Sequence, residues 1–428
     1  MNCNTQNAKI ASITEKTLIV GIDVGSETHY ARAFDWRNYE YAKKPLAFSN
    51  TEAGFQTFMA WMEDIAEKHG KTAVIPGMEP TGHYWFALGK FLQDSGMKPV
   101  HVNPHHVKKS KELDDNNPNK NDRKDPKTIA ALVNERRFSY PYIPTGIYAE
   151  IRSLSNLRFQ AQEELTRIKN RIARWFAIYF PEYKDVYGDL TAVSGRMVLK
   201  AAPLPGDIRK LGVEGVNQIW RDAKLRGAGM KRTKTLVSAA EHSVGSKEAP
   251  EAARMELRDL LDDLDVYALR LEGVLWKLEE KLREIPYIDK LREIKGIGLI
   301  TVGGFLAEVG DIGRFDNPKQ LQKLAGYAIV ANESGKHNGK SRISHRGRKR
   351  LRYVLYEAAI SLIGKNEAFR EIHEYYRTRK ENPLKKKQSV VAVACKIIRV
   401  FYAILTKGVA YDEAKLLGDI RRPQMQEV

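Results

Sequence analysis

The stretch Leu18-Ile19-Val20-Gly21-Ile22-Asp23-Val24-Gly25-Ser26 decides the fold class of this chain. Branched aliphatic residues dominate it, and glycine and serine close it, which is typical of a strand buried inside a sheet. Asp23 stands within this apolar run. A buried carboxylate is costly unless its charge is paired or bound to a cation. We therefore expect a buried strand whose acidic residue serves a functional site.

Strand and helix patterns alternate around this strand. The helix over 51–69 is expected to be capped by Thr51 and to bury an apolar stripe that includes Phe55, Phe58 and Met62. The first three strands are expected to form an antiparallel meander. The full expected order is strand 18–24, strand 29–36, strand 41–48, helix 51–69, strand 72–76, helix 82–95 and strand 99–103. This order is that of ribonuclease-H-like α/β folds. Functional groups of open α/β sheets gather near strand ends, which suits Asp23 and Glu79.

Residues 104–147 differ in composition from the preceding part. Lysine, asparagine and aspartate dominate from Lys108 to Lys127, which predicts a loop leading into a helix at Pro126. This segment contains two further candidate acids, Asp122 and Asp125. Asp114 and Asp115 precede two asparagines and are expected to lie in a solvated turn. The run Tyr140-Pro141-Tyr142-Ile143-Pro144 is interpreted as a domain boundary.

Two long helices are expected in the middle of the chain. The first begins near Ile151 and ends at Pro181, with apolar residues at three- and four-residue spacing. The second carries a heptad seam of Leu257, Leu260, Leu264, Tyr267, Leu271, Val274 and Leu278. Either the two helices pack together within one chain or the second forms a coiled-coil dimer. Between them, residues 182–250 are expected to form an irregular, glycine-containing insert with a basic patch.

The last third combines a glycine turn with the most basic stretch of the chain. Lys295-Gly296-Ile297-Gly298 resembles the turn of a helix-hairpin-helix motif, in which Gly296 and Gly298 would let backbone N–H groups approach a DNA phosphate. An ordinary helix–helix turn is the alternative. Ser334-Gly335 precedes a run of basic residues that we expect to bind nucleic acid: Lys336, Lys340, Arg342, Arg346, Arg348, Lys349 and Arg350. Residues 351–407 are expected to be helical.

Composition agrees with a polyanionic partner. The chain has 428 residues, 43% of them hydrophobic, and a formal net charge of +18, so it is globular and suited to phosphate-rich ligands. Cys3 and Cys395 have neither the spacing of a zinc site nor that of a disulfide framework. The sequence lacks a signal-peptide core and a run of about 20 apolar residues. We therefore expect a cytoplasmic protein without membrane insertion.

These motifs together resemble the DEDD transposases of bacterial insertion sequences. The family includes the bridge-RNA-guided recombinases and the pilin-gene invertases. The residues that carry the resemblance are the strand motif around Asp23, Glu79 after its strand, the box Lys120-Asn121-Asp122-Arg123-Lys124-Asp125, the Gly296/Gly298 turn, and Ser334-Gly335 before the basic segment. They occur in the family's order over almost the whole chain.

The resemblance implies three domains. These would be a RuvC-like catalytic domain over 1–147, a helical coiled-coil region over 148–285, and a C-terminal transposase domain over 286–428. Four acids would bind Mg²⁺, or alternatively Mn²⁺: Asp23, Glu79, Asp122 and Asp125. Ser334 would be the nucleophile that becomes covalently linked to DNA.

This chain departs from the family's usual acid box at two positions. Asn121 replaces a threonine and Pro126 replaces an alanine. A proline disfavours helical geometry at the residue before it, so Asp125 could instead be a helix N-cap with Pro126 as the first helical residue.

The resemblance also implies the partners. They are double-stranded DNA at the element ends and the target, a noncoding guide RNA, and further copies of the chain in a dimer or tetramer. No membrane partner is expected. The expected location is the bacterial cytoplasm, at the nucleoid.

Several alternatives stay open from the residues alone. Ser341 and Ser344 are rival serines, while Tyr327 and Tyr353 are rival hydroxyls that we expect to lie in the core. A Holliday-junction-type nuclease would share the fold and metals without needing Ser334. An ATPase of the actin and sugar-kinase type would share the first strand motif, but the sequence has no later Asp-x-Gly phosphate motif. A catalytically inert nucleic-acid-binding protein is the remaining class.

Overall fold

The computed structural model describes residues 3–42, 44–80, 82–114, 125–226, 229–334 and 337–425, with the backbone alone at 3–5, 113–114, 331–334, 337–341, 419 and 421–425. The chain divides into two compact units, Met1–Ile143 and Pro144–Val428. Each unit has its own hydrophobic core, so each is described by itself.

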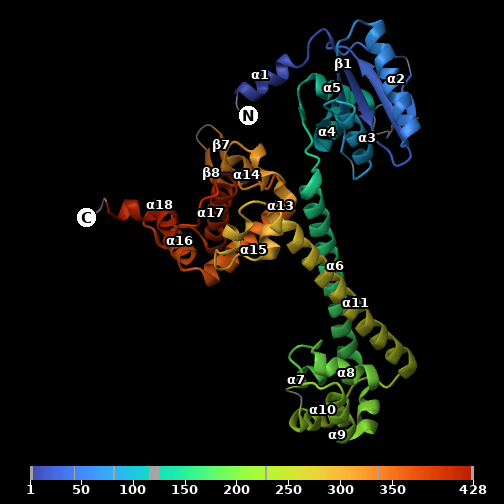
Figure 1. Cartoon of the computed structure of the whole chain (residues 1–428), viewed down its shortest axis with the longest axis vertical. Coiled ribbons are helices and arrows are strands. Elements are labelled where there is room, and N and C mark those ends of the chain that lie inside the picture. Colours follow the sequence, from blue (N-terminus) through green and yellow to red (C-terminus); the bar gives the residue numbers. More distant parts are fainter. Residues whose placement is uncertain are drawn as a thin grey trace. The chain divides into compact units, whose positions relative to one another are not determined.

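The first unit is built on a six-stranded mixed sheet in the order β3-β2-β1-β4-β5-β6 (Figure 1). β1 pairs antiparallel with β2, and β2 antiparallel with β3, which confirms the predicted meander. β4 lies parallel to β1, and β5 parallel to β4. The short β6 pairs antiparallel with β5. The strand bounds are β1 Thr17–Asp23, β2 Thr28–Phe34, β3 Leu46–Ser49, β4 Ala73–Met78, β5 Val100–Val102 and β6 Phe138–Ser139.

Alternation along β1 separates two apolar layers. Leu18, Val20 and Ile22 pack with residues of α2 and α3 in one buried cluster. Ile19 belongs instead to a cluster with Ile129 of α5. Successive side chains of a strand point to opposite faces, so both faces of this central strand are covered. The helices are α1 Cys3–Ala11, α2 Glu52–Lys68, α3 Trp85–Asp94, α4 Pro104–Asp114 and α5 Asp125–Asn134.

Most elements of the first unit agree with the sequence prediction; the exceptions are the bounds of β3, the helix α4, and the helix α1 and strand β6, which were not predicted. Thr51 caps α2 as expected, since its side chain accepts a hydrogen bond from the Gly54 N–H at 3.2 Å. β3 begins at Leu46 and not at residue 41. The expected loop after Lys108 is wrong up to Asp114, because these residues continue α4. The strand β6 was not predicted, since two residues carry too little pattern to identify.

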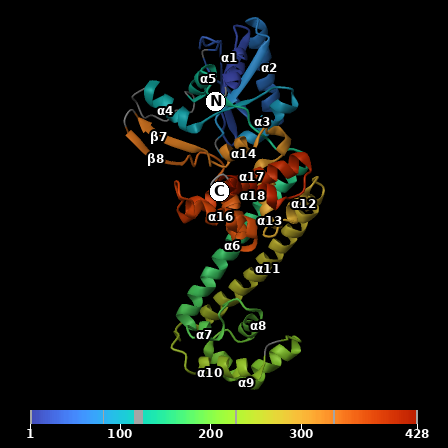
Figure 2. The ribbon, with the colours of Figure 1, turned by 90° about the vertical axis from the view of Figure 1, so that its left-hand side faces the viewer.

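Two helices of 34 residues each form the long axis of the second unit. α6 Gly146–Tyr179 and α11 Pro250–Arg283 lie side by side (Figures 1 and 2). Leu257, Leu260 and Leu264 of the predicted seam pack against Leu165 and Ile172 of α6 in one buried cluster. These seam residues therefore pack against α6 of the same chain, which is one of the two predicted alternatives.

The segment between the long helices is not irregular, contrary to the prediction. It folds into α7 Tyr183–Val186, α8 Val193–Ala201, α9 Pro205–Asp222 and α10 Met230–Glu241. Trp220 and Leu236 of these helices are buried with Trp175 of α6. The indole N–H of Trp220 donates to the Ser194 carbonyl at 2.9 Å. The glycines of this segment lower its helix propensity, so the sequence did not predict these short helices. Tertiary packing stabilises them instead.

The rest of the second unit is a helical body with one hairpin. Its helices are α12 Ile288–Arg292, α13 Leu299–Val309, α14 Pro318–Leu324, α15 Lys349–Lys365, α16 Glu367–Thr378, α17 Lys386–Lys407 and α18 Glu413–Met425, with a 3₁₀ turn η1 at Ile312–Arg314. β7 Ile329–Ser334 and β8 His337–Ile343 form an antiparallel hairpin, which was not predicted (Figure 2). The three-domain division stays a prediction.

α17 is the one described helix whose length and apolar composition would suffice to cross a membrane. Its residues Val393, Ile397 and Phe401 are buried in the large cluster of this unit. Packing in a protein core explains the apolar composition of α17.

Candidate active site

Asp23 and Glu79 occupy matching positions at the carboxyl ends of neighbouring strands. Ile22 of β1 pairs in parallel register with Met78 of β4, and each acid is the next residue along its strand. Adjacent strands lie about 4.8 Å apart. The structure therefore brings together two of the four predicted acids.

Two glycines set the face on which these acids lie. Gly21 and Gly77 are paired across β1 and β4 and stand two residues before Asp23 and Glu79, respectively. A Cβ on Gly21 would lie 1.8 Å from the Pro126 carbonyl oxygen, and one on Gly77 would lie 2.5 Å from Val133 Cγ2. α5 therefore packs directly on these glycines. Because side chains two residues apart share a face of the strand, both acids belong to the α5 side of the sheet.

Asp125 is the first residue of the helix that covers this face. It is buried at the start of α5, immediately before Pro126, whose carbonyl lies over Gly21. The structure thus places Asp125 inside the helix, although the proline after it had suggested a residue outside the helix. Three of the four predicted acids belong to one corner of the sheet, and Asp122 lies outside the described residues.

Lys111 of α4 completes this corner. Its ammonium pairs with Asp125 Oδ2 at 2.5 Å. Burial raises the pKa of Glu79, the Lys111 charge opposes that rise, and the Asp125 carboxylate adds to it. The carboxylates of Glu79 and Asp125 repel each other, so a further cation would be attracted to this corner.

The donor set suits a hard divalent cation. Mg²⁺ takes oxygen ligands, commonly one or two carboxylates together with a substrate phosphate. Within the described ranges, no three histidine, cysteine, aspartate or glutamate side chains are grouped closely enough to hold a metal ion. Asp23, Glu79 and Asp125 therefore do not form a complete metal site by themselves, although their carboxylate oxygens are ligands of the kind that Mg²⁺ binds.

No sequence feature pointed to Lys111, although its helix had a start signal. The side chain of Asn103 accepts a hydrogen bond from the His105 N–H at 2.9 Å, and Pro104 is the first helical residue. An asparagine followed by proline is a common way to begin a helix. The lysine-rich composition of the segment favoured a loop instead, so the sequence analysis did not predict this helix.

Ser334 is the last residue of β7 and pairs with His337 at the start of β8. Two residues connect them, so Ser334 stands at the tip of the hairpin. Its side chain, Gly335, Lys336 and the Lys340 side chain lie outside what the structure describes. Ser334 belongs to the second unit, whereas the acids belong to the first.

Two of the rival hydroxyls have structural partners. The Ser344 hydroxyl donates to the Gly326 carbonyl at 3.3 Å, and the Tyr327 hydroxyl donates to the Arg352 carbonyl at 2.9 Å. Tyr327 is buried as predicted, and burial raises the pKa of its hydroxyl. Tyr353 is 54% exposed, so its expected place in the core is wrong. The side chain of Ser341 lies outside the description.

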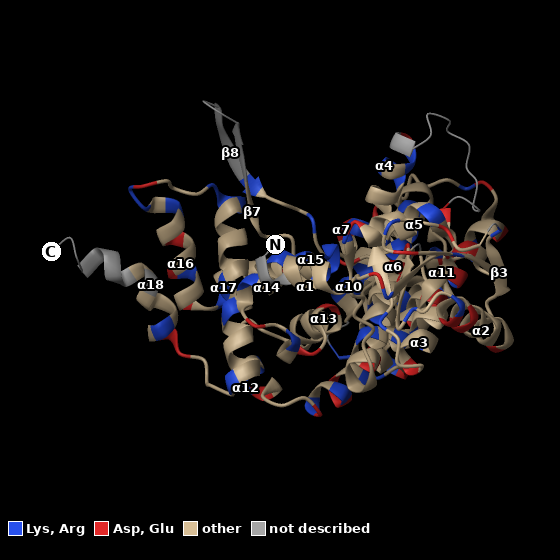
Figure 3. Ribbon diagram, turned by 90° about the horizontal axis from the view of Figure 1, so that it is seen from above, with Lys and Arg blue, Asp and Glu red and all other residues tan. Residues whose placement is uncertain are grey.

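Blue segments of the ribbon follow the hairpin toward α15 (Figure 3), and the basic residues there differ in their surroundings. Arg342, Arg346 and Lys349 are exposed. Arg348 donates to the Glu308 carbonyl at 2.5 Å and pairs with the Glu308 carboxylate at 3.5 Å. The candidate Arg348 is therefore held by protein contacts, while its three neighbours are open to a ligand. Arg350 contacts α6.

The turn before α13 has the contacts of a packed helix–helix connection. Gly296 has a φ of 106°, and its carbonyl accepts a hydrogen bond from the Ser361 hydroxyl of α15 at 2.9 Å. A Cβ there would lie 3.2 Å from Leu362 Cδ2. Gly298 is exposed and is the N-cap of α13. Gly296 is thus required by backbone conformation and packing, and Gly298 alone is open to a ligand.

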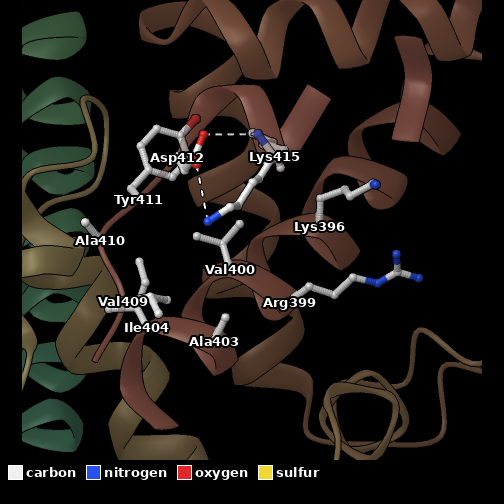
Figure 4. A pocket seen from close by; sticks show the side chains of 11 residues that line it. Lys396, Arg399, Val400, Ala403, Ile404, Val409, Ala410, Tyr411, Asp412 and Lys415 are labelled. Atoms are coloured by element: carbon white, nitrogen blue, oxygen red, sulfur yellow. Dashed lines mark hydrogen bonds and ion pairs between the residues drawn. The ribbon is translucent and has the colours of Figure 1, made fainter. Parts of the chain in front are cut away.

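A cavity of about 220 Å³ lies between α17 and α18, within the second unit (Figure 4). Val400, Ile404 and Tyr411 contribute apolar walls. Asp412 pairs with Lys415 at 3.5 Å, while Lys396 and Arg399 point away from that pair. This cavity contains none of the predicted site residues.

Comparisons with known proteins relate this chain to transposases of insertion sequences. Residues 20–181 match a family model described as a transposase of the DEDD, IS110 type, and residues 288–376 match one described as a transposase of the IS116/IS110/IS902 family. The chain is 26% identical, over 67% of its length and 71% of the relative's, to a protein of the insertion element IS116 from Streptomyces clavuligerus.

Two further relatives extend this similarity. The chain is 22% identical, over 94% of its length and 97% of the relative's, to a protein of the insertion element IS110 from Streptomyces coelicolor. It is 24% identical, over 63% of its length and 71% of the relative's, to the transposase for the insertion sequence element IS1111A from Coxiella burnetii.

Proposed function

Because this chain belongs to the DEDD transposases of the IS110 type and is a DNA transposase, we propose that its acids and Ser334 together cut and rejoin the DNA of an insertion sequence. The observation that carries the proposal is the corner of the first unit where Asp23 and Glu79 follow paired positions of β1 and β4 and the charge of Asp125 acts on Glu79. The first unit would be the RuvC-like catalytic domain, and residues 286–428 the domain that supplies the serine.

The acids would act as a binding site for Mg²⁺ or Mn²⁺. Asp23, Glu79 and Asp125 are the described ligands we propose, and Asp122 is the fourth. Such a cation, when bound, would neutralise phosphate charge and activate the reacting oxygens. Lys111, already paired with Asp125, would give up that carboxylate to the cation and turn toward phosphate.

Ser334 would form the covalent intermediate. Its hydroxyl oxygen would bond to the phosphorus of a DNA phosphodiester, and one bond from phosphorus to a deoxyribose oxygen would break. The proton lost by the serine would end on the released deoxyribose hydroxyl. Rejoining would reverse these steps with a different DNA hydroxyl. Exposed Arg342 and Arg346, on and just after β8, would stabilise the charge of the phosphorane-like transition state.

The remaining parts of the proposal concern partners and location. The DNA partners would be the element ends and the target, with a noncoding guide RNA that pairs with both. Gly298 and exposed Lys349 would contact backbone phosphates. The active form would be a dimer or tetramer located in the cytoplasm, at the nucleoid.

Covalent capture tests the serine mechanism. The full chain would be expressed with its native flanking DNA, purified under denaturing conditions and digested with nuclease, and adducts would be mapped by mass spectrometry. We expect a nucleotide adduct on Ser334 that is absent in Ser334→Ala and in Asp23→Asn. Ser341→Ala, in the same hairpin, and Asp64→Asn, an exposed acid paired with Lys68, are the matched controls and should keep the adduct.

Other results would change the assignment. DNA cleavage that persists in Ser334→Ala but is lost in Asp23→Asn would indicate a metal-dependent nuclease without a serine step. Recombination that survives removal of RNA by ribonuclease would refute guidance by RNA.

A further inference from the structure

An arginine of α6 is buried in the second unit with no acidic partner. Arg158 is 8% exposed. Its guanidinium carbon lies 4.3 Å from the centroid of the Phe159 ring. Within the part of the chain that the structure describes, no carboxylate forms an ion pair with Arg158. A buried charge without a counter-charge is costly, and proteins rarely keep one without a reason.

A second arginine approaches the same ring from α15. The guanidinium carbon of Arg350 lies 4.9 Å from the Phe159 centroid, so the two guanidinium groups are separated by no more than the sum of their distances to that point. Arg350 also donates to the Asn156 side chain of α6. No described carboxylate pairs with Arg350 either. Burial lowers the pKa of Arg158, nearby Tyr353 opposes this effect, and the charge of Arg350 lowers it further.

An exposed aromatic residue borders the two arginines. Tyr353 of α15 is 54% exposed, and its ring centroid lies 6.4 Å from that of Phe159. An aromatic ring open to solvent beside basic side chains is the combination on which nucleic-acid strands stack while their phosphates are neutralised. The cluster Arg158, Phe159, Arg350 and Tyr353, here called the α6–α15 platform, therefore combines two cations that have no described anion with an open aromatic face.

We propose that the α6–α15 platform binds the phosphodiester backbone of the DNA substrate: exposed Arg350 contacts a phosphate group, buried Arg158 adds its positive charge to the site, and Tyr353 lies against the adjoining sugar or base. A guanidinium binds phosphate through two parallel N–H donors, and a second positive charge in the same cluster strengthens that attraction. The proposal requires the DNA transposase activity of the family but not the role of Ser334.

The position of the platform favours DNA over other anions. α15 begins six residues after the end of β8, so one continuous segment joins the platform to the hairpin that carries Ser334. Exposed Arg346 and Lys349 lie in and directly after this connection. A strand held at the hairpin would thus meet further basic residues along its way to the platform.

DNA binding by the full chain, without divalent metal, tests the platform separately from catalysis. Fluorescence anisotropy with a labelled duplex of the element end would be measured over a series of salt concentrations. We expect Arg158→Met and Arg350→Gln each to weaken binding roughly 10-fold and to reduce the slope of log affinity against log salt by about one. Arg171→Gln, an exposed arginine on the same helix, is the matched control and should bind like the wild type.

Thermal unfolding separates this role from a packing role. Because Arg158→Met removes a buried, unpaired charge, the free variant should melt at the same temperature as the wild type or higher. A lower melting temperature with unchanged DNA affinity would make Arg158 a packing residue and overturn the proposal. Tyr353→Ala should weaken binding to the same duplex without changing the melting temperature.

The same binding measurement with a single-stranded RNA of equal length shows whether the platform binds DNA or RNA. Loss of affinity confined to RNA in the arginine variants would overturn the assignment to DNA. Loss of DNA affinity in the platform variants, combined with a normal Ser334 adduct at saturating protein, would support the platform. Absence of the Ser334 adduct in the wild type would affect the serine mechanism and leave the platform standing.

Discussion

At the scale of single residues, glycine is as important to the acid site as the acids are. Gly21 and Gly77 allow α5 to lie directly on β1 and β4, and this contact places Asp125, the first residue of α5, on the same face of the sheet as Asp23 and Glu79. A larger residue at either glycine would push the helix away from the sheet.

The substitution Gly21→Ala tests this close approach. Its Cβ would lie 1.8 Å from the Pro126 carbonyl oxygen, so the backbone of α5 must shift. We expect a loss of about 2–3 kcal/mol in the free energy of unfolding of the first unit, measured by urea denaturation. Gly188→Ala, where a Cβ would meet no atom within 4 Å, is the control. Equal stability of Gly21→Ala and wild type would contradict the packing argument.

At the scale of elements, buried polar contacts tie helices together. The Ser389 hydroxyl of α17 lies 2.8 Å from His373 Nδ1 of α16 and also contacts the His373 carbonyl at 3.0 Å. Both residues are buried. This pair aligns two helices that follow the platform helix α15.

The substitution Ser389→Ala should destabilise the second unit by about 1–2 kcal/mol, because His373 keeps its polar nitrogen but loses its partner. The double variant Ser389→Ala with His373→Leu should cost less than the sum of the two single changes, since no unpaired polar atom then remains at this contact. Denaturant unfolding of the four proteins measures this difference. Strict additivity would show that the two side chains do not interact.

At the scale of the whole molecule, buried histidines in both units make stability depend on pH. Burial lowers the pKa of His29 and His373, and it lowers the pKa of His101 to about 4. The unfolded chain therefore binds more protons than the folded one below pH 6.5 or so. The part of the stability that depends on these neutral histidines is fully present above that pH. It falls as the pH drops toward the pKa values of the folded state.

Urea unfolding at pH 7.5 and pH 5.5 measures this loss. His101 should account for about 1 kcal/mol of it, so His101→Gln should lose correspondingly less stability than the wild type between these two pH values. The exposed His105→Gln should behave like the wild type. An identical loss in His101→Gln would show that His101 is not buried in its neutral form.

Much of this fold could be predicted from local pattern. A continuous run of branched aliphatic residues identified β1, and the Thr51 cap identified the start of α2. Strong periodicity identified the two long helices. The elements that were missed are short, like β6, or have a composition that conceals their period, like α4 and the helices between α6 and α11. Their stability comes from packing against distant residues, which a local pattern does not contain.

The sequence by itself determined the order of most elements of the first unit through local pattern. Its motifs also resembled the family, and that resemblance supplied the acids and the serine proposed for catalysis. Only the tertiary structure decided that Lys111 pairs with Asp125, that Tyr353 is exposed, and that Arg158 and Arg350 meet over Phe159. Arg158 and Arg350 are 192 positions apart, and no periodicity links such residues. Their contact arises because burial of apolar surface brings α6 and α15 into one unit, and that packing depends on the whole chain.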